Sequence, residues 1–424
     1  MGIGKYLPTI ITGANKSLGD YLVKCTFRKN PKDFSRERKL GFKETVSFML
    51  NMINKTLQLE IDNFVEKVLN MDMTITKQAY LAARQKIKPE IFMKLNDDIN
   101  KIIYQEADDD GYKTWNGYRL SAIDGSVMEI PDTKELREEY GYIKNQNGQV
   151  ARAKAACIYD VVNKIVIKSK IDRYTASERE MAKSLITELL PDKKENELIL
   201  FDRGYPSSEL MVYLFDNKID FVMRAQRNYA KAVDNAKNED QIIVQYNKKC
   251  YKVKVLKFML DSGQEEILLT SLLDEKLTIK DFKNLYFKRW GIETKFDELK
   301  NRLEIENFTG TTKQAIEQDF YATIYISNMI ELVRTHNDEK IRKKHSEKGL
   351  KYEYKTNLNT LTGALKDKFV IMLMENSPRK RNKMLKVIEK QIAKSIIPIR
   401  PGRQNRRMKR QVLSKYKANR KRCL

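Results

Sequence analysis

Histidine is almost absent from this sequence, which has 2 such residues in 424, His336 and His345. Both fall in the polar stretch 335–349, away from any predicted strand end that could position a catalytic base. A Ser-His-Asp triad and a His-Glu-x-x-His zinc site are therefore disfavoured. No GxxxxGK[ST] or GxGxxG loop follows a predicted strand, so nucleotide hydrolysis and dinucleotide chemistry lose support. If the chain is an enzyme, carboxylates must do the chemistry.

Long apolar runs and paired cysteines are also missing. The longest mainly apolar runs, such as residues 198–201 and 267–273, fall short of the ~18 residues needed to cross a bilayer. We therefore expect no membrane span and no membrane partner. The four cysteines form no Cys-x-x-Cys pair, which favours reduced thiols of a cytoplasmic protein over a zinc cluster or a disulfide framework. They are Cys25, Cys157, Cys250 and Cys423.

Positive charge is the dominant compositional feature, with 81 Lys and Arg against 57 Asp and Glu and a formal charge of +24. A charge of this sign indicates a polyanionic partner, nucleic acid before a membrane surface. Much of it lies in residues 377–424, which contain 18 Lys and Arg and one acidic residue, Glu389. We interpret this stretch as a solvated, partly disordered extension that contacts phosphates on binding.

The N-terminal part, about residues 35–107, has apolar residues at helical spacing, interrupted at 70–73. Thr74 or Thr76 could cap the helix that follows. Two short helices around a turn suit a helix-turn-helix, whose second helix would offer its polar residues to DNA. An ordinary helical bundle fits the pattern equally well. The polar residues concerned are Lys77, Gln78, Arg84 and Lys86.

From residue 118 the pattern predicts an α/β domain with a mixed sheet, because a hairpin makes antiparallel neighbours and a helical crossover makes parallel ones. Further strands without helices follow, so we expect a small β insert, and then two long helices. The expected strands are 119–131, a hairpin over 150–174 that turns at Asn163-Lys164, 197–205, 221–225, 241–247, 250–260 and 264–273. The expected helices are 177–190, 207–217, 278–303 and 312–333.

Two aspartates each end an apolar run within a predicted strand, Asp124 after Ser-Ala-Ile and Asp202 after Leu-Ile-Leu-Phe. A carboxylate at the edge of a buried strand is costly unless a cation meets it. Each alone could simply belong to a turn, since Asp-Gly and Asp-Arg-Gly are common turn sequences. The first strand and the strand after the crossover helix can lie side by side, which would bring both carboxylates to one place.

A third acidic residue, Glu293, lies in the predicted helix 278–303. At ~100° per residue, Tyr286, Arg289, Glu293 and Lys300 lie close to one line along that helix. A surface ion pair between Arg289 and Glu293 is the alternative interpretation. A separate apolar stripe could hold the helix against a sheet: Leu285, Ile292, Phe296, Leu299 and Leu303.

This line of residues resembles the signature of the DDE transposases of the insertion sequence four family. Tyr286, Arg289, Glu293 and Lys300 reproduce its spacing, Tyr-x2-Arg-x3-Glu-x6-Lys, without a gap. The resemblance implies that Glu293 is a catalytic acid. It also implies that Tyr286, Arg289 and Lys300 bind DNA phosphates at the transposon end.

The resemblance extends over nearly the whole chain. IDGS at Asp124 and FDRGY at Asp202 look like the first and second aspartate motifs of the family, and the segment 34–50 is similar to its usual opening. The β insert falls where the family places one. The resemblance therefore implies that Asp124 and Asp202 complete the acidic triad. Arg203 and Tyr205 flank the second aspartate and could contact DNA or belong to the turn, and we favour the turn.

The fold that the resemblance implies is an RNase H-like mixed five-stranded sheet with an inserted small all-β domain, a helical N-terminal DNA-binding domain and a basic helical C-terminal region. We expect residues 1–110 to form the N-terminal domain. Residues 111–225 and 276–336 would form the two parts of the core, 226–275 the β insertion and 337–424 the C-terminal region.

The implied activity is cut-and-paste transposition: binding of terminal inverted repeats in double-stranded DNA, strand cleavage and strand transfer, within a synaptic homodimer. Asp124, Asp202 and Glu293 would hold two Mg²⁺ ions, which Mn²⁺ could replace, because hard cations prefer oxygen ligands. This chemistry requires no histidine. The alternatives are an inactive or domesticated DNA-binding repressor, and a related nuclease without strand transfer. Trp290, beside the polar line, is predicted to pack rather than to stack on a base.

Overall fold

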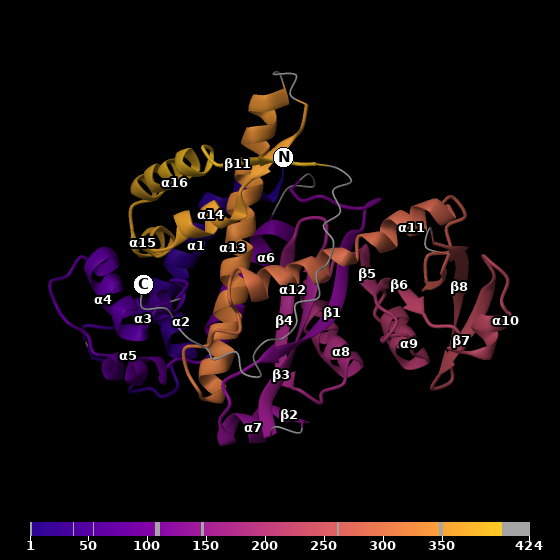
Figure 1. The fold of residues 1–424 in the computed structure, drawn as a ribbon, viewed down its shortest axis with the longest axis horizontal. Helices are drawn as coiled ribbons and strands as arrows, with labels where there is room; N and C mark the ends of the chain where they lie inside the picture. The colour runs from indigo at the N-terminus through magenta and orange to yellow at the C-terminus, as the bar shows by residue number, and fades with distance from the viewer. Residues whose placement is uncertain are drawn as a thin grey trace. The chain divides into compact units, whose positions relative to one another are not determined.

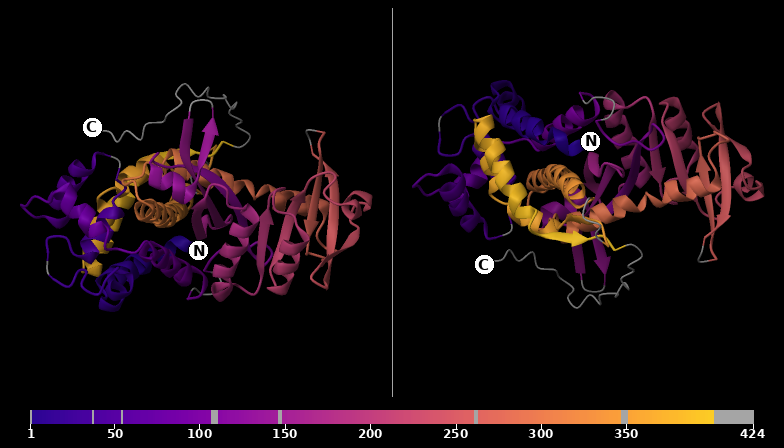
Figure 2. Two further views of the ribbon diagram at one scale, coloured as in Figure 1. Left: turned by 90° about the horizontal axis from the view of Figure 1, so that it is seen from below. Right: turned by 90° about the horizontal axis from the view of Figure 1, so that it is seen from above.

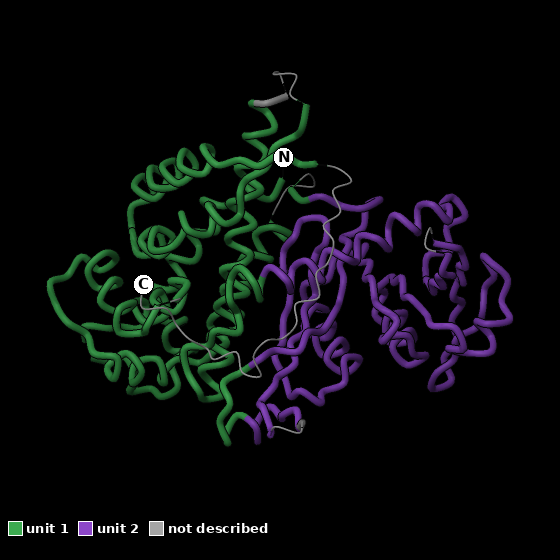
Figure 3. The backbone as a smooth tube through the Cα atoms, in the orientation of Figure 1, with its two compact units in different colours: residues 1–112, 130–136, 299–424 green, residues 113–129, 137–298 purple. Residues whose placement is uncertain are grey.

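The computed structural model describes residues 2–36, 38–53, 55–106, 111–145, 148–260, 263–346 and 351–400. Its contacts divide the chain into two compact units (Figure 3). Unit 1 comprises Met1–Tyr112, Ile130–Leu136 and Leu299–Leu424, and unit 2 comprises Lys113–Glu129 and Arg137–Glu298. Among the helices of the described residues, none is long and apolar enough to span a membrane.

Unit 2 is built on a mixed sheet (Figures 1 and 2). Strand β1 (Arg119–Glu129) lies between β3 (Gly148–Asp160), which is antiparallel to it, and β5 (Glu197–Phe201), which is parallel to it. β4 (Ile165–Arg173) pairs with β3, and β6 (Asp220–Ala225) runs parallel to β5. The resulting order β4-β3-β1-β5-β6 confirms the predicted mixed α/β sheet.

The connections follow from local sequence. The β3–β4 hairpin turns at Asn163 and at Lys164, which has a φ of +61°. Helix α8 (Glu178–Leu189) links β4 to β5 and contacts β1, β3 and β4. Helix α9 (Ser208–Asp216) links β5 to β6, and the Ser207 hydroxyl caps it by accepting the Leu210 N–H. These two crossovers make β1, β5 and β6 parallel to one another.

The predicted β insert continues the sheet of the core. β7 (Gln241–Tyr246), β8 (Lys249–Met259) and β9 (Glu265–Thr270) form an antiparallel group, and β9 pairs with β6. The described strands of unit 2 thus join in one sheet of nine. The apolar edge of β6 explains the continuity, because an unpaired buried strand would leave backbone N–H and C=O groups unsatisfied.

Further short elements went unpredicted. Helix α7 (Lys134–Tyr140) precedes strand β2 (Tyr142–Asn145), which extends the sheet beside β3, and the short helix α10 (Lys231–Asn235) precedes β7. Strands β10 (Tyr354–Thr356) and β11 (Ile396–Pro398) form a small antiparallel pair in unit 1. All have short or strongly charged sequences, which lack a periodic apolar signal.

The predicted helix 278–303 is two helices, so that prediction was wrong in detail. Helix α11 (Ile279–Phe287) begins with a capping box between Thr278 and Asp281. Helix α12 (Trp290–Asn301) follows after Lys288 and Arg289. Across this junction the backbone N–H groups of residues 288, 289, 291 and 292 donate three residues back. Such bonds tighten the turn, so the angle per residue differs from the α-helical value.

Unit 1 is mainly helical, and its longest helix, α13 (Lys313–Ser346), contacts α6 (Glu90–Tyr104) and α1 (Leu7–Gly19). Buried aliphatic and aromatic side chains from these helices form its core. The remaining described helices of unit 1 are η1 (Ile3–Tyr6), α2 (Tyr21–Phe27), α3 (Phe42–Met49), α4 (Leu57–Phe64), η2 (Val65–Leu69), α5 (Lys77–Arg84), α14 (Leu358–Leu365), α15 (Lys368–Met374) and α16 (Pro378–Ile392). In unit 2, the short helix η3 (Leu190–Asp192) follows α8.

The basic C-terminal stretch is ordered over its first part, where a solvated extension was expected. Helix α16 buries Leu385, Ile388 and Ile392, and Arg381 donates to the Glu375 carbonyl and to the Thr12 hydroxyl. These apolar residues, at helical spacing within a very basic sequence, explain the correction. The eleven basic residues from residue 400 onward lie, except for the first, outside the described residues.

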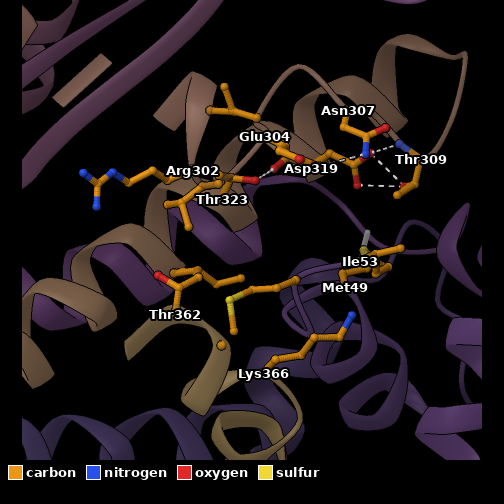
Figure 4. Close-up of a pocket in the computed structure, with 15 residues that line it drawn as sticks. Met49, Ile53, Arg302, Glu304, Asn307, Thr309, Asp319, Thr323, Thr362 and Lys366 are labelled. Carbon is orange, nitrogen blue, oxygen red and sulfur yellow. Dashed lines mark hydrogen bonds between the residues drawn. The ribbon is translucent and has the colours of Figure 1, made fainter. Parts of the chain in front are cut away.

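Helix α5 also departs from the expected recognition helix, because Arg84 is 2% exposed. Its guanidinium donates to Gln318 at 2.7 Å, to the Ala315 carbonyl at 2.9 Å, to Asp319 at 2.7 Å and to the Thr309 hydroxyl. Asp319 in turn accepts from the backbone and hydroxyl of Thr309 beside a cavity of about 180 Å³ (Figure 4). Arg84 therefore joins α5 to α13 and does not face solvent.

Candidate active site

The two aspartates lie side by side where the short strand β5 ends against the middle of the parallel strand β1. Ile123 of β1 pairs with Phe201 of β5, so Asp124 and Asp202 are the next residue on each strand. The Asp124 side chain is 21% exposed, and its Oδ1 accepts the N–H of Gly125 at 2.8 Å. The adjacency expected from the sequence is thus confirmed by the strand register.

Asp202 lies within hydrogen-bond distance of the phenol of Tyr286, which stands near the end of α11. The Tyr286 hydroxyl lies 3.3 Å from the Phe201 carbonyl oxygen and 3.5 Å from Asp202 Oδ1, and can donate to either. The residue is 4% exposed. Burial raises the pKa of Tyr286, and the charge of Asp202 acts in the same direction while Arg289 opposes it. The phenol therefore stays protonated and serves as a donor.

Arg289, at the junction of α11 and α12, lies among the carboxylates. Its Nη2 donates to Glu293 Oε1 at 2.7 Å, and its Nη1 is 3.8 Å from Asp124 Oδ2. Its guanidinium carbon lies 5.7 Å from the ring centre of Tyr286 and 5.4 Å from that of Trp290. Arg289 is 2% exposed, yet its Nε and Nη1 have no hydrogen-bond partner within the described residues.

Glu293 and Lys300 both belong to α12, seven residues apart. The Glu293 side chain is 36% exposed, so it is held by Arg289 while remaining accessible. Lys300 Nζ lies 3.5 Å from Glu306 Oε1 in unit 1. The structure thus brings together the two aspartates with Tyr286, Arg289 and Glu293 in unit 2. Lys300 lies farther along α12, where its described ion pair is with Glu306.

The electrostatics of the site reflect burial first and neighbouring negative charge second. Burial raises the pKa of Asp124 to about 6, and the charges of Asp202 and Glu293 push it in the same direction. The Gly125 N–H and the Arg289 guanidinium act against this rise. The arrangement is therefore one that an additional positive charge would stabilise.

A fourth carboxylate near the aspartates was missed by sequence reasoning. Glu178, the first residue of α8, lies 3.5 Å from where a Cβ would stand on Gly125 and 3.7 Å from one on Gly204. Lys154 Nζ is 3.8 Å from Glu178 Oε1. Arg179 donates to the Gly204 carbonyl at 3.1 Å, which ties α8 to the turn after Asp202. The sequence carries no clear signal for Glu178, since its place depends on the approach of α8 to the glycines near both aspartates.

The predictions for two aromatic residues near the site, Trp290 and Tyr205, have different outcomes. Trp290 is 44% exposed and Phe287 is 73% exposed, so the expectation that Trp290 is a packing residue was wrong. Tyr205, expected in the turn after Asp202, donates its backbone N–H to the Asp202 carbonyl at 3.1 Å. Its hydroxyl is buried without a hydrogen-bond partner among the described residues. The turn interpretation of Tyr205 is therefore confirmed.

The suitability of the site for a divalent cation rests on its donor chemistry. Within the described part of the chain, no three His, Cys, Asp or Glu side chains are grouped closely enough to hold a metal ion. The Arg289 guanidinium instead lies beside Asp124 and Glu293. Carboxylate oxygens are nevertheless the ligands that hard divalent cations prefer, and a bound cation would offset the burial and the neighbouring negative charges that raise the pKa of Asp124. The residues fit such an ion in their chemistry.

Fold and site together define an α/β protein with a carboxylate-lined site where the central strand β5 ends beside β1. Residues 115–329, about half of the chain, match the model of the family described as transposase DDE domain. The chain belongs to this family of DDE transposases. Members of the family cleave and transfer DNA strands, generally with divalent metal ions.

Other comparisons add less. The cryo-EM structure of the piggyBac transposase synaptic complex with hairpin DNA is similar, with a TM-score of 0.47 and 11% sequence identity. The similarity covers 89% of this chain and 85% of that chain. A likeness of this degree supports no statement about the chemistry of this chain. No curated protein matches it.

Proposed function

We propose that this DDE transposase belongs to the insertion sequence four family and catalyses cut-and-paste transposition. It would bind the terminal inverted repeats of its element, cleave there and join the 3′ ends to target DNA. One observation carries the proposal: Asp124 within β1 lies next to Asp202, the residue that follows the parallel strand β5, and Arg289 links Asp124 to Glu293. A protein that only binds DNA has no use for converging carboxylates, which repel phosphate.

We assign Asp124, Asp202 and Glu293 the role of holding two Mg²⁺ ions, which Mn²⁺ could replace. When bound, such ions neutralise charge at phosphorus and activate an oxygen nucleophile. The protein's own part is positional. The Gly125 N–H fixes one oxygen of Asp124, the Tyr286 hydroxyl lies within reach of Asp202, and Arg289 holds Glu293. These contacts reduce the movement that each carboxylate must make to reach its working geometry.

We assign Tyr286, Arg289 and Lys300 to phosphate contacts at the transposon end. The assignment of Arg289 is supported by its Nε and Nη1, which lack hydrogen-bond partners within the described residues. A phosphate oxygen could accept from them in a charge-assisted bond. Tyr286 is 4% exposed, so its hydroxyl would have to exchange its present acceptors for phosphate. Double-stranded DNA and a second copy of the chain, in a synaptic dimer, are the proposed partners.

The test is Mg²⁺-dependent strand cleavage of a duplex that carries the end of the element. Asp124→Asn, Asp202→Asn and Glu293→Gln should each abolish cleavage while duplex binding persists. Glu180→Gln is a matched control, because Glu180 lies on α8 and pairs with Lys183. Full cleavage by any of the three variants would refute the proposed roles, and strand-transfer products would separate a transposase from a nuclease.

A further inference from the structure

Glu178 lies between the two chain segments that carry the aspartates of the site. It is the first residue of α8, which packs beside β1 (Figure 1). Its Oε1 lies 3.5 Å from where a Cβ would stand on Gly125, the residue after Asp124. Its Oε2 lies 3.7 Å from where a Cβ would stand on Gly204, in the turn after Asp202. One oxygen of the carboxylate therefore faces each segment.

The end of β5 makes this part of β1 accessible from both faces of the sheet. β5 ends at Phe201, which pairs with Ile123, whereas β1 continues beyond that pair. From Asp124 onward, β1 has no partner on its β5 side among the strands of the described residues. Successive residues of a strand point to opposite faces, so Asp124 points away from the face that Gly125 turns to α8. Because no strand separates the two faces here, carboxylates on both can approach one ion.

Arg289 compensates one side of the site more than the other. Its guanidinium donates to Glu293 at 2.7 Å and lies 3.8 Å from Asp124. The side chain of Asp202 contacts the neutral phenol of Tyr286 at 3.5 Å and forms no ion pair within the described residues. A further cation is therefore needed most beside Asp202, on the side that faces α8.

Glu178 is held near the site and keeps its carboxylate available. Lys154 Nζ lies 3.8 Å from Glu178 Oε1 and donates to the Ala176 carbonyl at 2.7 Å. Within the described residues, the Glu178 carboxylate accepts no hydrogen bond. Its side chain is 42% exposed, and exposed side chains change rotamer readily. Glu178 can therefore turn toward an ion without breaking a hydrogen bond.

Tyr205 gives an independent indication of a ligand at this place. The residue is 1% exposed, and its hydroxyl has no hydrogen-bond partner among the described residues. Burial raises the pKa of this hydroxyl, and the charges of Asp124, Glu178 and Asp202 raise it further, so the hydroxyl lies among the three carboxylates. The charge of Arg289 acts against the rise. A buried donor without a partner, placed among carboxylates, points to a polar or ionic ligand.

We propose that Glu178 is a fourth carboxylate ligand of the site and binds the divalent cation together with Asp124 and Asp202. The proposal deepens the proposed function and rests on it. Carboxylate oxygens suit hard divalent cations, and Glu178 adds them on the side of the site where Arg289 forms no ion pair.

Binding of Mn²⁺ to the metal-free full chain, followed by the electron paramagnetic resonance signal of free Mn²⁺, tests the proposal without any reaction. Glu178→Gln should lower the Mn²⁺ affinity about tenfold or more. Glu178→Asp, which keeps the charge on a shorter side chain, should lower it less, and it decides the test if the first variant does not fold. Circular dichroism of each variant checks the fold.

Glu180→Gln is the matched control for the helix dipole. Glu178 and Glu180 both lie in the first turn of α8, where the dipole stabilises carboxylates. The Glu180 side chain is 68% exposed and pairs with Lys183 on the same helix at 3.3 Å. Glu180→Gln should therefore bind Mn²⁺ as the wild type does, and an equal loss in both variants would overturn the proposal.

Lys154→Gln separates a metal ligand from an ion-pair partner. If Glu178 binds the cation, removal of the competing Lys154 charge should leave the Mn²⁺ affinity unchanged or raise it. If Glu178 only anchors Lys154, Glu178→Gln and Lys154→Gln should weaken Mn²⁺ binding equally, which would overturn the proposal.

Cleavage of an end-containing duplex distinguishes this proposal from the proposed function. Glu178→Gln should cleave more slowly than the wild type and recover part of the lost rate at higher Mg²⁺ concentration, while duplex binding persists. Wild-type Mn²⁺ affinity in Glu178→Gln, in a chain that cleaves and whose Asp124→Asn variant does not, would overturn the role of Glu178 alone. A wild-type chain that does not cleave, or an Asp124→Asn variant that does, would overturn the proposed function.

Discussion

Two arginines of this chain, Arg84 in unit 1 and Arg289 in unit 2, are equally buried, at 2% exposure each, but differ in their partners. Every nitrogen of the Arg84 guanidinium donates to a side chain or carbonyl. Arg289 has one hydrogen bond, and its Nε and Nη1 have none within the described residues. A satisfied buried cation indicates a structural role, whereas an unsatisfied one beside carboxylates indicates a site prepared for a ligand.

The largest effect should come from Arg84. Arg84→Ala removes the donor from Asp319 and Gln318 and leaves a buried carboxylate without its cation. We expect a loss of about 3–5 kcal/mol in the free energy of unfolding, measured by urea denaturation. Lys77→Ala, on the exposed start of the same helix, should change the free energy of unfolding by under about 0.5 kcal/mol. A stable Arg84→Ala protein would contradict the structural role.

Arg289→Ala should reduce cleavage strongly and stability only slightly. Because Arg289 makes a single hydrogen bond, its loss should cost little stability, while cleavage of an end-containing duplex should fall about 10²–10³-fold, the cost of losing one positioned charged donor. Arg289→Lys should restore only part of the activity, since lysine lacks the planar guanidinium. If Arg289→Ala were strongly destabilised but kept its specific activity, Arg289 would have a structural role like that of Arg84, which would contradict the account.

The pH dependence of stability tests whether Asp124, beside Arg289, lies among uncompensated charges. The pKa of Asp124 is about 6 in the folded chain, above its ordinary value of 3.8. The folded state then holds more protons between these values, so stability falls as pH rises through that window. In metal-free buffer, Asp124→Asn should therefore be more stable than wild type at pH 7, on the order of 1 kcal/mol, and the gain should vanish below about pH 4. If the variant exceeded the wild type in stability by the same amount at pH 7 and below pH 4, the raised pKa of Asp124 would not be the cause of the gain.

The smallest effects should separate two buried phenols. Tyr286→Phe loses a donor within reach of Phe201 and Asp202 and should cost about 1 kcal/mol. Tyr205→Phe removes a hydroxyl without a partner among the described residues and should be neutral or slightly stabilising. Thermal denaturation of both variants compares them, and a larger loss for Tyr205→Phe would contradict the hydrogen-bond assignment.

The parts of the fold that depend on local pattern were predictable from the sequence. Apolar runs that end at Asp124 and Asp202 predicted the neighbouring strands β1 and β5, because a crossover helix between them requires parallel pairing. The apolar stripe with Leu285 and Ile292 predicted the buried face of α11 and α12. The break at Arg289 was missed, because the stripe continues across it and a tightened turn leaves no trace in the spacing.

Features that depend on distant partners could not be read from the sequence. Arg84 looked like an exposed helical cation, since its partner Asp319 lies far along the chain. Glu178 looked like an ordinary residue in the first turn of a helix, where carboxylates are favoured by the helix dipole. Its place beside the aspartates depends on the approach of α8 to Gly125 and Gly204. Periodicity carries no information about such tertiary contacts.

The central claim is that Asp124, Asp202 and Glu293 act as one site for phosphoryl transfer. The most direct measurement compares Mg²⁺-dependent cleavage by the single variants Asp124→Asn, Asp202→Asn and Glu293→Gln with cleavage by the double variant Asp124→Asn, Asp202→Asn. Residues that act as a unit are non-additive, so each single variant should fall to the same background as the double variant. A single variant that keeps much of the wild-type cleavage, with the double variant lower by the product of the two losses, would contradict the claim.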